Sequence, residues 1–187
     1  MRAFIAIDFG RQLKNEIAVL QSKLREQSMQ GRWKYIDNFH LTLKFLDEVE
    51  PPAVKEIDEL LKTISGSTGR FTLKISELGN FPGNGCLRVL WLGLGGELDR
   101  LRRLQGRIDS ELQKLGFSIE KRGYTPHVTI GQDIRFDKDF ESIKAGVNFR
   151  HMPEIHVDRI YLFKSEQLGN KRVYTPVREY AFACNGL

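Results

Sequence analysis

Two four-residue segments of the sequence share one chemical pattern, a histidine, an apolar residue, a threonine and a second apolar residue. The first starts at His40 in "NFHLTLKF" and contains Thr42; the second starts at His127 in "YTPHVTIG" and contains Thr129. An imidazole with an ordinary pKa near 6.5 can give or take a proton at neutral pH. Displacement at phosphorus needs one such group on each side, while threonine hydroxyls can hold the phosphate oxygens. The pair of segments therefore indicates phosphodiester chemistry, and the pattern alone leaves open which histidine is the acid.

Each tetrad must be positioned by a strand, because polar and apolar residues alternate through both segments. Alternate side chains of a strand point to opposite faces, so His40, Thr42 and Lys44 are expected to share one face. The residues between them, beginning with Leu41, form an apolar face that can pack on a core. The polar face can then line a cleft, where Lys44 would add positive charge.

The elements around the tetrads follow one plan twice. In each half of the sequence a β-prone run is followed by a long amphipathic helix, and a tetrad comes at nearly the same distance from the start of the run. Two similar lobes would each contribute one tetrad strand to a shared cleft. Residues 1–187 are therefore expected to form a single domain of two pseudo-symmetric lobes. Strands are predicted near residues 2–9, 32–36, 39–46, 71–78, 88–95, 124–130, 156–164 and 173–182, and helices near 12–29, 51–65, 98–115 and 138–146.

Composition limits the partners and the compartment. Lysine and arginine number 29 against 24 acidic residues, which gives a net charge of +5 and favours a polyanionic partner. No apolar run approaches the length of a membrane span, and Asp8 follows the start too closely for a signal peptide, so a cytoplasmic location is expected. The two cysteines, Cys86 and Cys184, form no CxxC pair and are expected to be reduced.

Other readings of the tetrads remain open. They could be the polar faces of two exposed strands, with threonine present for its β-propensity. A catalytic zinc site needs three protein ligands, and neither tetrad carries a second ligand at a suitable spacing; His151 and His156 each stand alone. A serine nucleophile in a GxSxG turn is absent, although a triad assembled in space is not excluded.

The tetrads resemble those of the 2H phosphoesterase superfamily. The segments "GRWKYIDNFHLTLKFLDEV", "RVLWLGL", "YTPHVTI" and "LFKSEQLGNKRVYTPVREY" are similar to the RNA 2',3'-cyclic phosphodiesterase family, also called 2'-5' RNA ligases. The resemblance implies a bilobal α+β fold with largely antiparallel sheets lining a central cleft and helices outside. It implies hydrolysis of RNA 2',3'-cyclic phosphate ends to 2'-phosphomonoesters, with ATP-independent, reversible 2'-5' ligation to 5'-hydroxyl ends as a related activity.

The same resemblance assigns roles to individual residues. His40 would give a proton to the leaving 3' oxygen, His127 would activate water, and Thr42 and Thr129 would hold the phosphate. No metal and no cofactor would be required, and a monomer is expected.

Two positions depart from the family pattern. Gln132 stands where an arginine is common, so phosphate affinity or substrate preference is expected to differ. Asp47 stands where glycine is usual, which affects the local turn geometry.

Further RNA contacts are suggested by aromatic and basic residues. Trp33 and Tyr35 alternate with Arg32 and Lys34, so the aromatic rings could stack on bases or pack in the sheet. Tyr124 and Phe163 offer the same two readings. A basic rim is suggested by Arg88, Lys164, Lys171 and Arg172.

Two alternative functions remain. The chain could be another 2H phosphodiesterase, acting on small cyclic nucleotides or on linear oligonucleotides. It could also be a non-catalytic RNA-binding module, against which the two intact tetrads argue.

Overall fold

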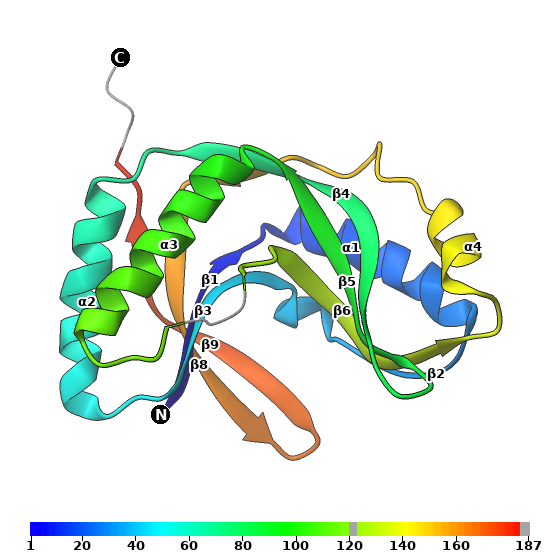
Figure 1. The fold of residues 1–187 in the computed structure, drawn as a ribbon, viewed down its shortest axis with the longest axis horizontal. Coiled ribbons are helices and arrows are strands. Elements are labelled where there is room, and N and C mark those ends of the chain that lie inside the picture. The colour runs from blue at the N-terminus through cyan, green and yellow to red at the C-terminus, as the bar shows by residue number, and fades with distance from the viewer. Residues whose placement is uncertain (120–122, 184–187) are drawn as a thin grey trace.

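The computed structural model describes residues 1–119 and 123–183. This part of the chain forms nine strands and four α-helices, and Figure 1 shows how they are arranged. The strands are β1 (Arg2–Asp8), β2 (Ser28–Trp33), β3 (His40–Glu48), β4 (Phe71–Pro82), β5 (Leu87–Gly96), β6 (His127–Phe136), β7 (Ile155–Val157), β8 (Arg159–Leu168) and β9 (Lys171–Ala181). The helices are α1 (Arg11–Glu26), α2 (Pro51–Gly66), α3 (Leu98–Lys114) and α4 (Phe140–Ala145), with a 3-10 turn, η1, at Ile36–Asn38.

The strands form two antiparallel sheets, which confirms the α+β class. The first sheet has the order β3-β1-β8-β9 and the second has the order β2-β6-β5-β4-β7. In both sheets the tetrad strand pairs with the strand that opens its half of the sequence, β3 with β1 and β6 with β5. The repeat seen in the sequence thus corresponds to equivalent strand pairs.

The sheets do not divide the chain into its two sequence halves. Strand β2 comes from the first half but joins the second sheet beside β6, while β8 and β9 return from the end of the chain to join the first sheet. The single strand predicted at 156–164 is wrong, because the chain changes sheet at Asp158. There, β7 pairs with β4 and β8 pairs with β1, and the Asp158 carbonyl accepts a hydrogen bond from the Phe182 amide instead of continuing a ladder.

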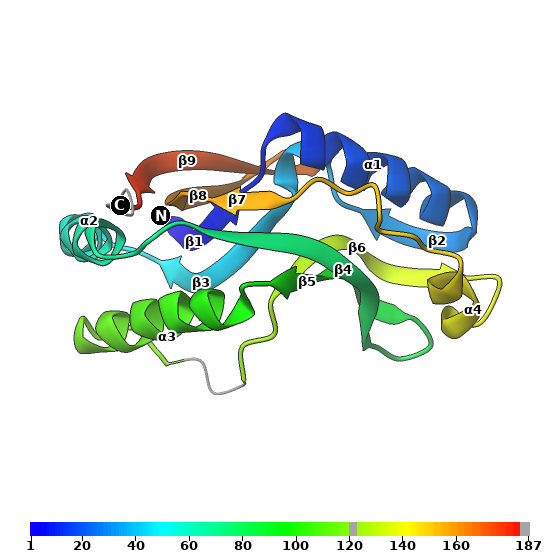
Figure 2. The ribbon, with the colours of Figure 1, turned by 90° about the horizontal axis from the view of Figure 1, so that it is seen from above.

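The helices lie outside the strands, gathered at two ends of the molecule (Figure 2). Helices α2 and α3 pack together near β3 and β9, and α1 packs against β2. The apolar helix faces predicted from the spacing are buried, with Ile17, Ile57 and Leu101 fully inside. They join side chains from both sheets in one core cluster, which holds the tetrad strands in place.

Both tetrads contain a β-bulge at the same place. The pairing of β3 with β1 skips Leu43, and the pairing of β6 with β5 skips Ile130; each is the fourth residue of its tetrad. A bulge shifts the side-chain alternation by one residue. Lys44 therefore turns toward the interior, and Phe45 takes the face of the histidine on β3, as Gln132 does on β6.

Candidate active site

The His40 ring is held by two hydrogen bonds at the start of β3. Its Nδ1 lies 2.8 Å from the carbonyl oxygen of Asn38, and its Nε2 lies 3.0 Å from the hydroxyl of Thr42. A carbonyl oxygen can only accept, so Nδ1 carries the hydrogen and Nε2 of the neutral ring accepts from Thr42. Asn38 is itself fixed, because its side-chain amide donates to the backbone carbonyl of Arg172 at 2.8 Å.

His127 is held in the same way at the start of β6. Its Nδ1 lies 2.7 Å from the carbonyl oxygen of Thr125, two residues earlier, just as His40 bonds to Asn38. The hydrogen again belongs to Nδ1, which leaves Nε2 available for proton transfer. Both histidines are thus oriented by backbone two residues upstream.

The two tetrads line one cavity of about 260 Å³. Both histidines and both threonines contribute to its wall, so the shared cleft predicted from the repeat is present. A second cavity of about 350 Å³ adjoins it and shares Thr42, Phe45 and His127 with it. The rest of the first cavity wall consists of Arg2, Ala3, Phe4, Lys34, Asn38, Phe45, Gln132, Ser165, Arg172 and Tyr174.

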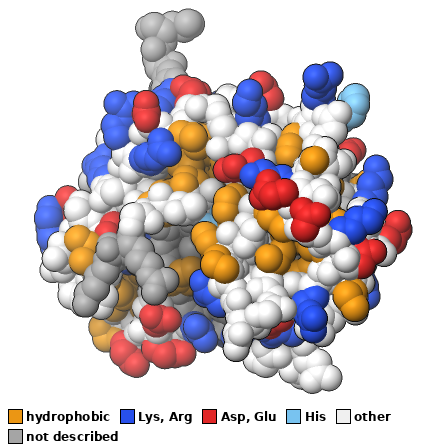
Figure 3. All heavy atoms as spheres, turned by 45° about the vertical axis from the view of Figure 1, so that its right-hand side comes forward, with side chains coloured by type: hydrophobic (Ala, Val, Ile, Leu, Met, Phe, Trp, Pro, Cys, Tyr) orange, Lys and Arg blue, Asp and Glu red, His pale blue; other side chains and the backbone are white. Residues whose placement is uncertain are grey.

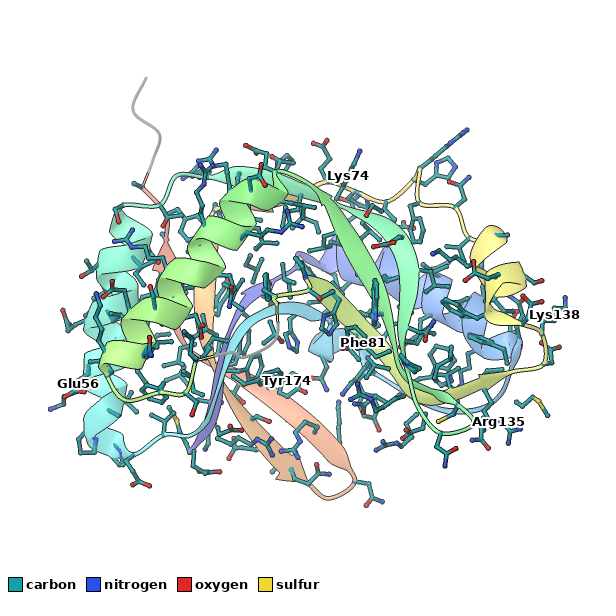
Figure 4. All side chains as sticks on the ribbon, in the orientation of Figure 1. Glu56, Lys74, Phe81, Arg135, Lys138 and Tyr174 are labelled. Atoms are coloured by element: carbon teal, nitrogen blue, oxygen red, sulfur yellow. The ribbon has the colours of Figure 1, made fainter. Side chains whose placement is uncertain are left out.

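Aromatic rings pack against both histidines. Phe4 and Tyr174 lie 4.9 Å and 5.1 Å from the His40 ring, centre to centre. Phe81 meets the His127 ring edge-on at 5.1 Å. Tyr174 and Phe81 are labelled near the middle of Figure 4, between the sheets, whereas Lys138 and Arg135 lie far to one side. These rings fix the imidazoles and remove water from around them.

Burial keeps both histidines neutral in the free protein. Desolvation is the main cause that lowers the pKa of His40 to about 4, and the nearby positive charges of Lys34 and Lys14 lower it further. Protonated His127 also depresses the pKa of His40, so the two rings are close enough to interact. Desolvation lowers the pKa of His127 as well, against the effect of its bond to Thr125. An anion in the cavity would favour the protonated rings.

Contrary to the prediction from the alternation, Lys44 does not share the face of His40 and Thr42, although it is among the residues that line the second cavity. Its ammonium group pairs with Asp109 and donates to the carbonyl of Ser118, and the residue is only 7% exposed. The bulge at Leu43 is the physical reason, since it reverses the alternation one residue before Lys44.

The family model of LigT-like phosphoesterases matches residues 7–91 and 94–174. The chain belongs to the LigT-like phosphoesterase family.

Relatives of similar length support this membership. The RNA 2',3'-cyclic phosphodiesterase of Thermotoga maritima is 32% identical over 183 residues, covering 97% of this chain and 96% of the relative. The protein of the same name from Methanocaldococcus jannaschii is also 32% identical, covering 96% of this chain and all of the relative. The crystal structure of E. coli LigT complexed with 3'-AMP superposes with a TM-score of 0.81 at 26% identity over 97% of both chains. The same enzyme complexed with phosphate gives 0.73 at 25% identity, over 97% of both chains.

The other residues suggested as RNA contacts have different surroundings. Gln132 lines the first cavity, on the face of Thr129. Tyr124 lines the second cavity, but its hydroxyl donates to the backbone carbonyl of Thr42 at 2.9 Å. Trp33 packs against the core and lines neither cavity. Phe163 is buried against Phe4, in the aromatic group beside His40.

The suggested basic rim is only partly at the site. Arg172 lines the first cavity and Arg88 the second. Lys164 pairs with Glu166, and Lys171 lies over the centre of the Tyr35 ring at 4.6 Å. Neither lysine lines either of these two cavities. On the face shown in Figure 3, side chains of both charge signs are interspersed, so the net positive charge is not gathered there.

Sequence reasoning missed Phe45, Tyr174 and Ser165 as cavity residues. A bulge in β3 and the return of β8 and β9 to the first sheet bring them to the site, and neither event has a clear signal in the sequence. The skipped residue in each tetrad is apolar and fits an uninterrupted strand equally well.

Three further expectations concern the rest of the chain. Cys86 is a free thiol, and Cys184 lies outside the described residues. Within residues 1–119 and 123–183, no three histidine, cysteine or acidic side chains gather where they could hold a metal ion. In the same ranges, no helix has the length and apolar character needed to cross a bilayer.

Proposed function

We propose that this protein hydrolyses RNA 2',3'-cyclic phosphate ends to 2'-phosphomonoesters without a metal ion. The observation that supports this most directly is the equivalence of His40 and His127. Each ring is fixed through Nδ1 to a carbonyl two residues upstream, and each presents Nε2 to one cavity with a threonine beside it. The two relatives described above are named RNA 2',3'-cyclic phosphodiesterase, and the E. coli relative was crystallised with 3'-AMP and with phosphate.

In the proposed reaction, a water oxygen attacks phosphorus while Nε2 of His127 takes a proton from it. The bond between phosphorus and the 3' oxygen breaks, and protonated Nε2 of His40 gives its proton to that oxygen. The products are a 2'-phosphomonoester and a free 3'-hydroxyl. The family resemblance supports this assignment of acid and base. After product release, His127 gives its proton to solvent and His40 takes one up, which restores the starting state.

Binding of the substrate prepares His40 for this role. The free ring is neutral at pH 7 because burial lowers its pKa to about 4. An anionic phosphodiester in the cavity raises that pKa, because it favours the imidazolium over the neutral ring. Thr42 would then turn its hydroxyl from Nε2 to a non-bridging phosphate oxygen, and Thr129 would hold the other side. Oriented donors of this kind act where charge develops in the transition state.

The same chemistry accommodates joining of RNA ends. When the 5'-hydroxyl of a second RNA takes the place of water, attack on the cyclic phosphate forms a 2'-5' linkage and releases the same 3'-hydroxyl. No bond energy from ATP is required, since the strained cyclic diester is exchanged for another diester. We propose ligation as the secondary activity, favoured by high concentrations of 5'-hydroxyl ends.

The decisive assay identifies the product from an RNA with a 2',3'-cyclic end, in the presence of EDTA. The proposal predicts a phosphate left on the 2' oxygen and undiminished turnover with the chelator. A parallel reaction with free nucleoside 2',3'-cyclic phosphates tests whether the RNA chain is required. Product with phosphate on the 3' oxygen, or turnover that stops with EDTA and returns with a metal, contradicts the proposal.

Single replacements test the two proton carriers. His40→Ala and His127→Ala are each expected to lower kcat by about 100- to 10,000-fold, the usual contribution of general acid or base catalysis. His151→Ala serves as the control, because His151 is exposed and lines neither cavity. Full activity of either tetrad variant, with folding verified by circular dichroism, would refute the assignment.

A further inference from the structure

The proposed reaction needs positive charge next to the phosphate, because negative charge builds on the non-bridging oxygens as water attacks. On β6 the residue on the cavity face beyond Thr129 is Gln132, which is neutral. The cavity wall nevertheless contains three cations in the described part of the chain, Arg2, Lys34 and Arg172. Arg2 is 55% exposed at its side chain and lies 3.8 Å from the carboxylate of Asp47. Lys34 and Arg172 are therefore the cations to consider.

The backbone of Lys34 is fixed to the second tetrad. Its amide donates to the carbonyl of Ile130 at 3.1 Å, and the side-chain amide of Gln21 donates to the carbonyls of both Lys34 and Ile130 at 2.8 Å. Ile130 is the bulged residue that directly follows Thr129. Lys34 is thus tied to the catalytic strand at the point where the phosphate would be bound.

Lys34 and Gln132 line the same cavity where β2 ends beside β6. Arg32 pairs with Gln132 across β2 and β6, so these two side chains share a face. Lys34 directly follows Trp33, the last residue of β2. It lines the first cavity together with Gln132 and Thr129, so its ammonium group can reach a phosphate held there.

Lys34 also differs from the other enclosed lysines in its partners. Lys44 pairs with Asp109, and Lys14 pairs with Asp8 at 2.6 Å. Among the described residues, no carboxylate forms an ion pair with Lys34. Burial, followed by the positive charges of Arg32 and Arg172, lowers the pKa of Lys34. An enclosed ammonium group next to other cations gains stabilisation from an anion that enters the cavity.

Arg172 approaches from the other sheet. It lies in β9, contacts the Ser165 hydroxyl at 3.4 Å, and its backbone carbonyl holds the Asn38 side chain that lies beneath His40. Its charge is close enough to lower the pKa of Lys34. The two cations thus reach one cavity from opposite sheets, one beside each tetrad.

We propose that Lys34, supported by Arg172, binds a non-bridging oxygen of the substrate phosphate and supplies from the end of β2 the positive charge that Gln132 does not provide on β6. This assignment rests on the proposed function, since it names the residue that binds the phosphodiester of that reaction. It predicts that the position of the charge can be exchanged between residues 34 and 132 across the β2 and β6 pair.

The experiment compares four forms, the wild type, Lys34→Met, Gln132→Arg and the double variant Lys34→Met/Gln132→Arg. Hydrolysis of the cyclic phosphate end gives kcat and KM, and calorimetric titration with inorganic phosphate gives binding without turnover. Lys34→Met is expected to lower kcat/KM and phosphate affinity by about 10- to 100-fold, the usual effect of losing a charged hydrogen bond. The double variant is expected to recover at least tenfold of this loss, because an arginine at 132 restores the charge to the same cavity.

Two controls separate a local charge from other effects. Lys138→Met removes the same charge far from the cavity (Figure 4) and is expected to change either quantity less than twofold. Lys34→Arg keeps the charge and should retain most of the phosphate affinity. Thermal unfolding of each variant verifies that the fold is intact.

The outcomes distinguish this inference from the proposed function. Wild-type protein that leaves the cyclic phosphate intact contradicts the function, while the phosphate titration still tests the role of Lys34. Lys34→Met with wild-type phosphate affinity overturns the inference, even when hydrolysis is observed. A loss in Lys34→Met that Gln132→Arg does not restore also overturns it, because a merely structural lysine would give that result.

Discussion

The hydroxyl of Tyr124 donates a hydrogen bond of 2.9 Å to the backbone carbonyl of Thr42, and so joins the segment before one tetrad to the middle of the other. Tyr124 precedes His127 by three residues, while Thr42 contacts His40 directly. This single bond therefore links the positions of the two imidazoles across the cavity. Burial raises the pKa of the Tyr124 hydroxyl, so it remains a donor throughout the physiological range.

Tyr124→Phe removes this link and keeps the ring. Loss of the bond leaves the Thr42 carbonyl without this donor, which is expected to cost about 1 kcal/mol of unfolding free energy. A several-fold decrease in kcat is expected as well, because small misplacements of catalytic groups are costly. Urea denaturation and steady-state kinetics measure the two effects. The control is Tyr35→Phe, since Tyr35 is 50% exposed and lines neither cavity; equal effects in both variants would show that the link is unimportant.

The pH dependence of kcat/KM is expected to follow the lowered pKa values of the two histidines. The reaction needs one proton on the pair, and both pKa values lie below 6.5 in the free protein, that of His40 at about 4. As pH rises above the higher of the two values, the singly protonated form is lost. The value of kcat/KM should therefore fall between pH 7 and 9, approaching tenfold per pH unit.

The profile of kcat should extend to higher pH, because the bound phosphodiester raises both pKa values. Measurements at saturating and at low substrate concentration separate the two profiles. His151→Gln should leave both unchanged, since this histidine lies outside the cavities. A kcat/KM that is flat or rises from pH 7 to 9 would contradict the expected protonation states.

Asp47, in the first tetrad strand, stands where the family pattern usually has glycine, and its backbone conformation can be tested by substitution. Its φ of 53° lies in the left-handed region. Glycine adopts this region without strain, so glycine suits this position. Asp47→Ala should unfold at lower urea concentration than Asp47→Gly, with a difference of about 1 kcal/mol. Both variants lose the contact with Arg2, so it cancels in the comparison. An alanine variant as stable as the glycine variant would show that this backbone conformation is not retained.

The sequence predicted which tetrad residues meet in one cavity better than it predicted the orientation of the residues that follow them. His40 and Thr42 share a face because the strand alternates regularly up to Thr42, and His127 and Thr129 share one for the same reason. The alternation rule fails immediately afterwards, at Lys44, because a bulge is set by pairing with a neighbouring strand and not by local residue types.

Long-range pairing explains the other differences between sequence and structure. The apolar and aromatic residues of 156–164 fit one strand, yet the chain passes from the second sheet to the first at Asp158. From the sequence alone, Lys34 is only a basic residue between two aromatic ones, Trp33 and Tyr35. Its place in the cavity depends on bonds to Ile130 and Gln21, which are distant in the sequence. Contacts of this kind cannot be read from periodicity.

Phe45 is the position at which the bulge in the first tetrad strand should matter most for substrate recognition. The bulge brings this ring to the cavity face, where it is 63% exposed and borders both cavities. An exposed aromatic ring beside the phosphate site can stack on a nucleobase, an interaction worth about 1 to 3 kcal/mol. Phe45→Ala should therefore raise KM for a cyclic phosphate end by about 5- to 100-fold with a much smaller effect on kcat.

The matched variants make this test specific. Phe45→Trp keeps an aromatic face and should retain a KM near that of the wild type. Leu168→Ala removes another exposed apolar side chain, 60% exposed at the far end of β8, and should change KM less than twofold. Because Phe45 is exposed, its loss should leave the unfolding free energy nearly unchanged, so a higher KM reports recognition and not stability. An unchanged KM in Phe45→Ala would mean that the base is bound elsewhere, and the second cavity, lined by Phe81 and Tyr124, would be the next place to test.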